Sequence, residues 1–207
     1  MKIPKLYALF LAIIIAFGCI AFTFSEKKIG NEAIEESDET ETIAIEENKP
    51  FDKMMLALTH KRCVNCHPAG DRPLQGEDSH IHNYNVQRGI NDSGIGALNC
   101  RTCHQKQNSN LAGVPGNDKW KLAPREMFWE GLTRVEIARS MTNPEINGGK
   151  TLEETIKHLT EDELVLWAWE PGISQDGTPR EKPPISKEEY IKAVKDWYAG
   201  GAVIPEK

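Results

Sequence analysis

One five-residue pattern occurs twice in this chain and constrains its fold more than any other feature. A cysteine, two variable residues, a second cysteine and a histidine occupy residues 63–67 and again residues 100–104. The two-residue gap brings both sulfur atoms to one edge of a porphyrin, and the histidine that follows is held beneath the iron as its proximal ligand. The pattern is therefore the attachment signature of c-type haem. It predicts two covalently bound haems, with thioether bonds from Cys63, Cys66, Cys100 and Cys103 and proximal iron ligands His67 and His104.

Four cysteines in two closely spaced pairs are also compatible with a zinc site or with two disulfides. In such zinc sites about 15–20 residues usually separate the pairs, whereas 33 residues separate Cys66 from Cys100. Neither zinc nor a disulfide requires a histidine directly after each pair, and a disulfide across only two residues is mostly a redox-active arrangement. The fifth cysteine, Cys19, lies in the N-terminal segment, so the motifs use every other cysteine of the chain. Haem attachment is the interpretation that accounts for both histidines.

The N-terminus has the features of a targeting segment. A short basic start precedes 19 uncharged residues from Leu6 to Phe24. This run is longer than the roughly 7–15 apolar residues of a cleaved signal and close to the roughly 20 that span a membrane. We therefore expect residues 1–25 to be an N-terminal membrane anchor, a signal cleaved after residues 23–25, or, with the poorest fit, a lipoprotein signal at Cys19. Each alternative places the rest of the chain on the periplasmic side, anchored to the membrane or free in the periplasm.

Residues 26–50 form an acidic stretch that we expect to be a disordered linker. They contain nine acidic and three basic residues, no aromatic residue and no helical or alternating apolar period. This stretch carries a net charge of −6, so residues 51–207 are close to neutral. Because the chain has no basic patch, nucleic acid is not expected as a partner.

We expect residues 51–207 to form one mainly α-helical domain, a small multihaem cytochrome c with two unlike halves. Residues 68–116 are rich in Gly, Pro, Asn and Asp and lack a strong apolar period. Such a stretch can still be compact where it wraps a haem, because the porphyrin is a large apolar body that replaces aliphatic side chains. The C-terminal half is expected to be helical.

Helix boundaries follow from apolar spacing and from capping signals. Apolar residues at helical spacing predict a helix over residues 51–62 that leads into the first motif. A Ser or Thr followed three residues later by Glu satisfies the free N–H groups at a helix start. The last helix is expected to end at Gly200-Gly201, and the prolines and glycines of residues 170–184 predict a loop. The capping pattern occurs four times and predicts helices that begin at Thr133, Thr151, Thr160 and Ser186.

The two irons need sixth ligands from outside the motifs. Four further histidines are available, together with methionines, whose thioether can also bind haem iron. His82 lies between the motifs in a loop that can approach a porphyrin closely, and His158 lies beside the apolar stripe of a predicted helix. We therefore predict His82 as the distal ligand of one iron and His158 of the other, with His60, His80 and Met127 as the remaining candidates. Two bis-histidine irons would be low-spin.

Segments outside the motifs resemble one family of small exported proteins. In the first half the resemblance lies in residues 66–76, Cys-His-Pro-Ala-Gly-Asp-Arg-Pro-Leu-Gln-Gly. In the second half it lies in residues 122–124, 127–132, 147–149 and 164–172, and in Leu152 with His158. Members of this family are often labelled as a subunit of isoquinoline 1-oxidoreductase, a molybdenum hydroxylase. The resemblance covers about residues 55–205 and implies an electron-carrying partner of such an enzyme, while no segment resembles the molybdenum-binding or iron–sulfur parts of a hydroxylase.

These patterns predict a dihaem electron-transfer protein that exchanges electrons with redox partner proteins, one electron at each iron. An enzyme is the alternative, because a haem with an open sixth position could bind peroxide or another small oxidant. No second motif requires such a reaction, and 207 residues is small for a dihaem peroxidase. We therefore expect an electron carrier rather than a peroxidase-like enzyme.

Overall fold

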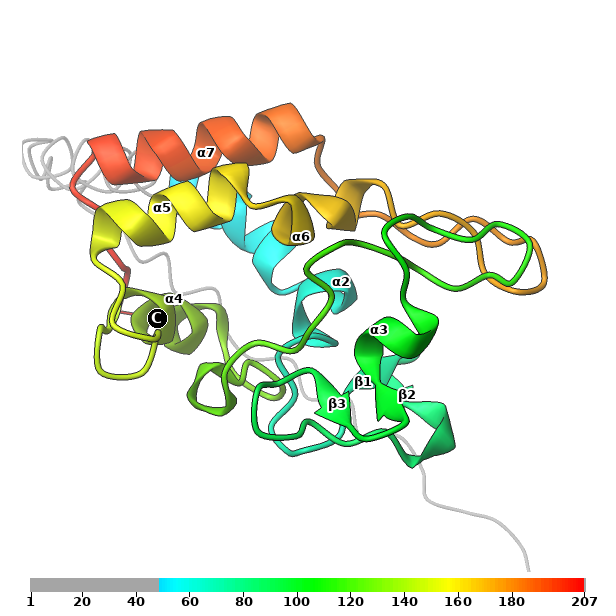
Figure 1. The fold of residues 1–207 in the computed structure, drawn as a ribbon. Helices are drawn as coiled ribbons and strands as arrows, with labels where there is room; N and C mark the ends of the chain where they lie inside the picture. The colour runs from blue at the N-terminus through cyan, green and yellow to red at the C-terminus, as the bar shows by residue number, and fades with distance from the viewer. Residues whose placement is uncertain (1–48, 207) are drawn as a thin grey trace, which may run out of the picture.

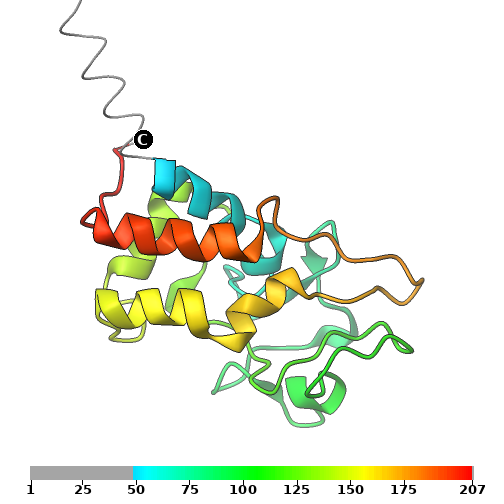
Figure 2. The same ribbon diagram turned by 90° about the horizontal axis from the view of Figure 1, so that it is seen from above.

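The computed structural model describes residues 49–206, in which the longer helices gather on one side and short hairpins and loops on the other (Figures 1 and 2). The first described segment, residues 49–58, is helical. The α-helices that follow are α2 (Lys61–Val64), α3 (Cys100–Cys103), α4 (Arg134–Thr142), α5 (Leu152–Glu161), α6 (Glu163–Leu166) and α7 (Lys187–Ala199). Single 3-10 turns are η1 (Asn83–Asn85), η2 (Arg125–Met127) and η3 (Trp167–Trp169).

The strands are short and lie only in the first half of the domain. They are β1 (Leu74–Gln75), β2 (His80–Ile81), β3 (Gly94–Ile95) and β4 (Leu98–Asn99). Two antiparallel hairpins result, β1 with β2 and β3 with β4. With two residues to a strand and far longer helices, the described chain is mainly α-helical, as predicted.

Two predicted segments fall largely outside the described residues. The N-terminal targeting segment, residues 1–25, lies there completely, and so does the acidic linker apart from residues 49–50, which already belong to the first helix. Within residues 49–206, no helix is long and apolar enough to cross a membrane.

Three of the four predicted capping boxes begin helices. Thr133, Thr151 and Ser186 are the N-caps of α4, α5 and α7, and each side chain accepts a hydrogen bond from the backbone N–H three residues later. The glutamate at that third position accepts in return from the N-cap backbone N–H. At the other end of α7, Gly200 is the C-cap and Gly201 has a φ of 89°, as the sequence predicted.

The prediction that a helix begins at Thr160 is wrong. Thr160 is buried inside α5, where its hydroxyl donates to the Ile156 carbonyl 2.9 Å away. The next helix, α6, begins after Asp162, whose carboxylate accepts from Leu164 N at 2.9 Å. A threonine whose hydroxyl is already bound to its own helix has no free oxygen directed at the next helix start, so the carboxylate two residues later acts as the cap.

The predicted helix over residues 51–62 is interrupted before the first motif. It ends at residue 58, and α2 starts again at Lys61 with His60 as its N-cap. The imidazole Nδ1 of His60 accepts from the Arg62 backbone N–H at 3.3 Å. The first cysteine, Cys63, therefore lies in a separate short helix, α2, and not in the first helix.

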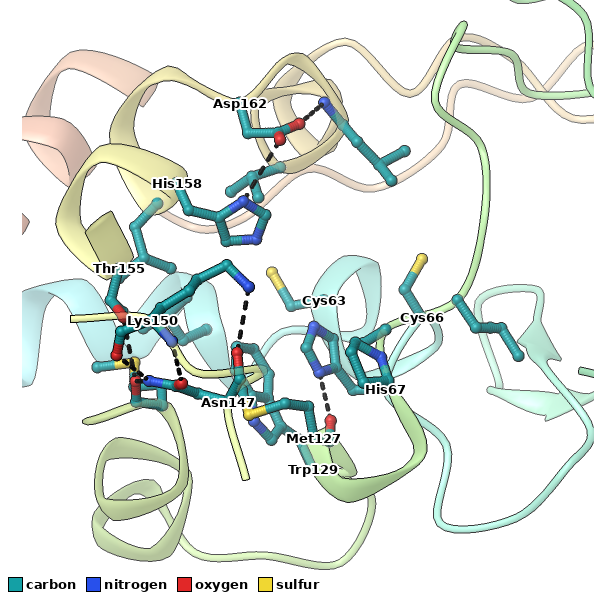
Figure 3. A pocket seen from close by; sticks show the side chains of 18 of the residues that line it. Cys63, Cys66, His67, Met127, Trp129, Asn147, Lys150, Thr155, His158 and Asp162 are labelled. Atoms are coloured by element: carbon teal, nitrogen blue, oxygen red, sulfur yellow. Dashed lines mark hydrogen bonds and ion pairs between the residues drawn. The ribbon is translucent and has the colours of Figure 1, made fainter. Parts of the chain in front are cut away.

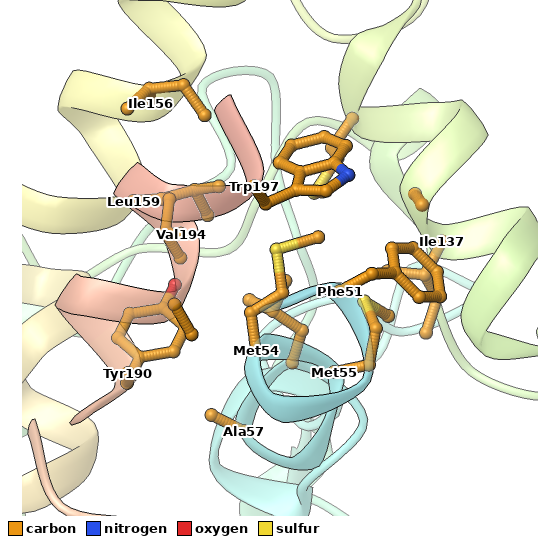
Figure 4. Packing of buried hydrophobic residues seen from close by; sticks show 14 of the residues in the cluster. Phe51, Met54, Met55, Ala57, Ile137, Ile156, Leu159, Tyr190, Val194 and Trp197 are labelled. Atoms are coloured by element: carbon orange, nitrogen blue, oxygen red, sulfur yellow. The ribbon is translucent and has the colours of Figure 1, made fainter. Parts of the chain in front are cut away.

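The hydrophobic core lies where the first helix meets α4, α5 and α7 (Figure 4). Residues 49–58 bury Phe51, Met54 and Leu58 to 1% exposure or less. Cys63 packs against the edge of this cluster, so the first motif is continuous with the core. The buried partners from the other helices include Ile137 and Met141 of α4, Ile156 and Leu159 of α5, and Tyr190, Val194 and Trp197 of α7.

Two loops run side by side away from the helices, one after α3 and one after η3 (Figure 1). The Asn108 amide donates to the Glu170 carbonyl at 2.7 Å, and the Arg180 guanidinium donates to the Gly113 carbonyl. The second of these loops confirms the prediction of a loop over residues 170–184. The first carries the backbone that follows the second Cys-x-x-Cys-His motif, so these contacts hold the two loops together just beyond that motif.

Candidate haem sites

The first motif begins in α2 and continues in the turn that follows it. Backbone hydrogen bonds from Cys66 N to Cys63 O (3.1 Å) and from His67 N to Val64 O (2.9 Å) keep the helical curvature. Residues three apart on such a turn lie on one side of it, so both sulfur atoms share a face. Cys63, Cys66 and His67 all line one cavity of about 330 Å³.

His158 of α5 enters the same cavity from the side opposite His67 (Figure 3). The two rings are close enough for the charge of His158 to lower the pKa of His67. The cavity wall between them is mostly apolar, as a porphyrin face requires. Its apolar residues include Leu58, Leu122, Met141, Leu159, Leu164 and Val165.

His67 is held by two contacts that leave one nitrogen free. Its Nδ1 lies 2.5 Å from the Met127 carbonyl oxygen. Because a carbonyl can only accept, Nδ1 carries the proton, and Nε2 is the unprotonated nitrogen that can bind a metal. The ring is stacked on Trp129 with centroids 3.7 Å apart and planes 9° apart. Desolvation lowers the pKa of His67 to about 4, so the imidazole is neutral at physiological pH.

His158 is oriented by a carboxylate in the same manner. Its Nδ1 lies 3.3 Å from Asp162 Oδ2, one helical turn further along the chain. A ring that donates Nδ1–H to a carboxylate presents Nε2 as its basic nitrogen. The side chain of His158 is 42% exposed, because the ring projects from α5 into the cavity.

The second motif coincides with α3 and follows the β3–β4 hairpin. Asn99 caps the helix, its side chain accepting from Arg101 N at 3.1 Å. His104 follows, and its Nδ1 donates to the Pro115 carbonyl at 2.7 Å. The ring is stacked on Trp120 with centroids 4.4 Å apart and planes 9° apart, and desolvation lowers the pKa of His104 to about 4. The surroundings of His104 therefore repeat those of His67.

His82 faces His104 at a separation that fits two ligands of one iron. The ring centroids are 6.1 Å apart, with planes at 69°. An imidazole nitrogen lies about 2.0 Å from a first-row metal and about 1.2 Å from its own ring centre, so two imidazoles on opposite sides of one ion have centroids about 6.4 Å apart. The Nδ1 of His82 donates to the Asn83 carbonyl at 2.8 Å, so here too Nε2 is free.

The remaining two histidines use both ring nitrogens in other contacts. His60 accepts at Nδ1 from Arg62 N and contacts Glu181 Oε1 through Nε2 at 3.3 Å. His80 contacts Asp78 Oδ1 through Nδ1 at 2.6 Å and the Gln75 amide through Nε2 at 2.9 Å. The six histidines thus divide into two with no free nitrogen and four whose Nε2 has no hydrogen-bond partner among the described residues. The four are His67, His82, His104 and His158.

Met127 contributes its backbone carbonyl to the first site, and its side chain also lines the cavity. Its carbonyl holds His67, so the residue lies on the proximal side of that cavity. A sixth ligand has to approach from the opposite face, where His158 lies (Figure 3). In the structure, His158 rather than Met127 lies across the cavity from His67.

The four motif cysteines are free thiols and do not converge on one metal. Burial raises the pKa of Cys63 to about 12 and that of Cys66 to about 11. In residues 49–206, no group of three or more His, Cys, Asp and Glu side chains is arranged to hold one metal ion. The two motifs are nevertheless neighbours. Cys100 lies close enough to Cys66 for its charge to contribute to the raised pKa of Cys66.

Sequence patterns did not identify several residues that shape these sites. Trp129 and Trp120 are far from their histidines in any short motif, and the carbonyl groups of Met127 and Pro115 carry no side-chain signal. Asp162 could have been found, because it lies four residues after His158 in a helical segment.

Comparison with known proteins finds no matching family model, no similar curated protein and no similar solved structure. The assignment of these sites therefore depends on the motifs and on the geometry of the histidines that surround them.

Proposed function

We propose that this chain is an electron-transfer protein with two covalently attached c-type haems. The observation that supports this most directly is the pairing of its histidines. Each motif histidine has a free Nε2 and lies near a second histidine with a free Nε2, His67 near His158 and His104 near His82. A haem iron with two axial histidines needs this arrangement.

The chain's own groups prepare these ligands for binding. The carbonyls of Met127 and Pro115 keep the proton of each proximal ring on Nδ1, so the other nitrogen stays directed at the iron position. The Asp162 carboxylate does the same for His158 and raises the basicity of its Nε2. When bound, each haem supplies one iron that takes up and releases one electron.

The histidine pairs favour a carrier over the peroxidase-like alternative. A haem enzyme that activates peroxide needs an iron face that the small molecule can reach. With His158 and His82 as sixth ligands, both irons would be six-coordinate and low-spin, and neither would bind small ligands readily.

The cellular location and the partners proposed for this function are inferred from the sequence. The uncharged run from Leu6 to Phe24 favours export, to the membrane or to the periplasm, and the acidic residues 26–50 would extend as a spacer because like charges repel. Redox proteins are the expected partners, in keeping with the resemblance to subunits of a molybdenum hydroxylase.

Haem content provides the first test. The protein, produced by export in a host that matures c-type cytochromes, should have the mass of the chain plus two haems after acid–acetone extraction. A mass equal to the bare polypeptide, or to the polypeptide with one haem, would contradict the proposal.

Axial ligation provides the second test. In electron paramagnetic resonance (EPR) spectra of the oxidised protein, both haems should be low-spin, and His158→Ala and His82→Ala should each convert one haem to high spin. His60→Ala and His80→Ala are matched controls, because those rings have no free nitrogen and should leave both signals unchanged. High-spin iron in the unmodified protein would favour the enzyme instead.

A further inference from the structure

We propose that Trp129 and Trp120 are positioning residues that fix the ring planes of the two proximal histidines. The inference rests on the proposed dihaem function and goes beyond it, because it assigns a role to residues outside the motifs and outside the ligand set. In both sites an indole lies parallel to the imidazole within 9°.

A hydrogen bond alone leaves each ring one degree of freedom. The contact of Nδ1 with the Met127 or Pro115 carbonyl sets which nitrogen faces the iron, but the ring can still tilt about that contact. An indole stacked at 3.7 Å or 4.4 Å between centroids opposes this tilt, because rotation would lift one face off the other. The two contacts together determine both the direction and the plane of the ring.

The arrangement occurs twice with unrelated local structure, which argues for a common role. Trp129 follows η2, far along the chain from His67, whereas Trp120 lies in the loop that leaves α3 shortly after His104. Neither the spacing nor the flanking sequence is shared. Three other tryptophans, at positions 167, 169 and 197, have no stacked histidine among the described residues.

The two indoles are themselves held with unequal firmness. Trp129 is 4% exposed, and its Nε1 donates to Ser140 Oγ of α4 at 3.1 Å. Trp120 is half-buried and meets the edge of Trp167 at 4.9 Å, while Trp167 is anchored through its Nε1 to Asn108 Oδ1 at 3.0 Å. Trp129 is thus anchored to the helical core, and Trp120 is anchored to the two paired loops.

Ring plane matters because the orientation of the axial imidazoles determines the splitting of the iron orbitals. That splitting sets the g values of a low-spin ferric haem, and it contributes to the reduction potential. A residue that fixes the plane of one histidine should therefore affect one haem and leave the other unchanged.

The test replaces each indole by leucine, which keeps apolar volume but has no flat face to stack. We expect Trp129→Leu to shift or broaden one of the two low-spin EPR signals, and Trp120→Leu to shift or broaden the other. The matched control is Trp197→Leu, which removes an equally buried indole that contacts Phe51 instead of a histidine. It should lower the thermal stability and change neither signal.

Phenylalanine variants at the same two positions keep a flat ring and should restore most of the native signal. Unchanged signals in both leucine variants, or equal shifts in Trp197→Leu, would overturn the inference. Should Trp129→Leu fail to fold, the half-buried Trp120→Leu still decides it. All variants are first measured for haem content: two haems with unaltered signals contradict only the positioning role, whereas unmodified protein without haem contradicts the proposed function itself.

Discussion

The two Cys-x-x-Cys-His motifs hold their histidines in the same manner but lie in unlike surroundings. The first motif borders the helical core, and its cavity is closed by α5 and α6. The second lies among hairpins and loops, where Cys103 is exposed. Large apolar side chains are exposed around it as well, among them Ile81, Tyr84, Ile95, Leu98 and Leu111.

This difference separates what a short motif specifies from what the rest of the chain specifies. Five residues set the attachment of a haem and its proximal ligand. Burial, charge and access come from elements distant in sequence, such as His158 and its neighbours in α5 at the first site. The same chemical group can therefore behave differently at the two positions, and each of the following experiments measures one part of that difference.

The largest expected effect is on stability. Replacing Cys63 and Cys66 by alanine should remove the first haem and leave a cavity in contact with the core. At about 24 cal/mol per Å³, an empty cavity of about 330 Å³ costs on the order of 8 kcal/mol as an upper bound, since the walls can collapse or admit water. That is comparable with the whole stability of a typical domain.

The matched double variant, Cys100→Ala with Cys103→Ala, should lose the second haem and keep the helical core folded. Thermal unfolding followed by far-ultraviolet circular dichroism would compare the two. An equal loss of stability in both double variants would show that the first site is not the structural one.

The second effect concerns access to the irons. His82→Gly and His158→Gly each create an open position that free imidazole can fill. We expect imidazole to restore the low-spin spectrum at the second site about tenfold faster or more, because that site lies among exposed loops while the first cavity borders the helical core. Stopped-flow absorbance gives both rates. Faster rescue of His158→Gly would reverse the comparison.

Local patterns predicted the parts of the fold that local interactions determine. Three capping boxes begin helices as expected, because each satisfies its own N–H groups within four residues. Thr160 fails because its hydroxyl is taken by its own helix and Asp162 is the better-placed cap. Two adjacent candidate caps cannot be ranked from a single sequence, because the sequence does not show which side chain is buried.

The site shows the same division between local and distant information. His82 and His158 could be proposed from the sequence, and the structure places each beside a motif histidine. The stacked indoles could not be assigned, because Trp129 reaches His67 only through the path of the chain between them. A ligand can thus be predicted from the sequence where few residues of the required type are available. The contacts that support the ligand depend on tertiary structure.

The third effect is on reduction potentials. Burial disfavours the more positively charged ferric state, so the first haem should have the higher potential of the two. Lys150 adds to this difference, because it lines the first cavity and its Nζ donates to the Asn147 carbonyl at 3.1 Å. Lys150→Gln should lower the potential of the first haem by tens of millivolts, on the order expected for one partly screened charge.

Lys150→Arg keeps the charge and serves as the control for that variant. Spectroelectrochemical titration would resolve the two haems, and the second should not move in either variant. A shift of equal size in the arginine variant would mean that packing, and not charge, sets the difference.

The smallest expected effect comes from Asp162, which links α6 to the first site. Its Oδ2 contacts His158 Nδ1 while its Oδ1 caps α6 through Leu164 N. Asp162→Asn keeps a cap oxygen but removes the charge, so the helix should persist while His158 becomes a weaker donor to ferric iron. The potential of the first haem should rise by less than Lys150→Gln lowers it, because the contact is 3.3 Å long and the Asp162 side chain is 24% exposed. Glu161→Gln removes the same charge from the neighbouring exposed position and should leave both potentials unchanged. Equal shifts in the two variants would assign the effect to net charge alone and would leave no specific role for the histidine–carboxylate contact.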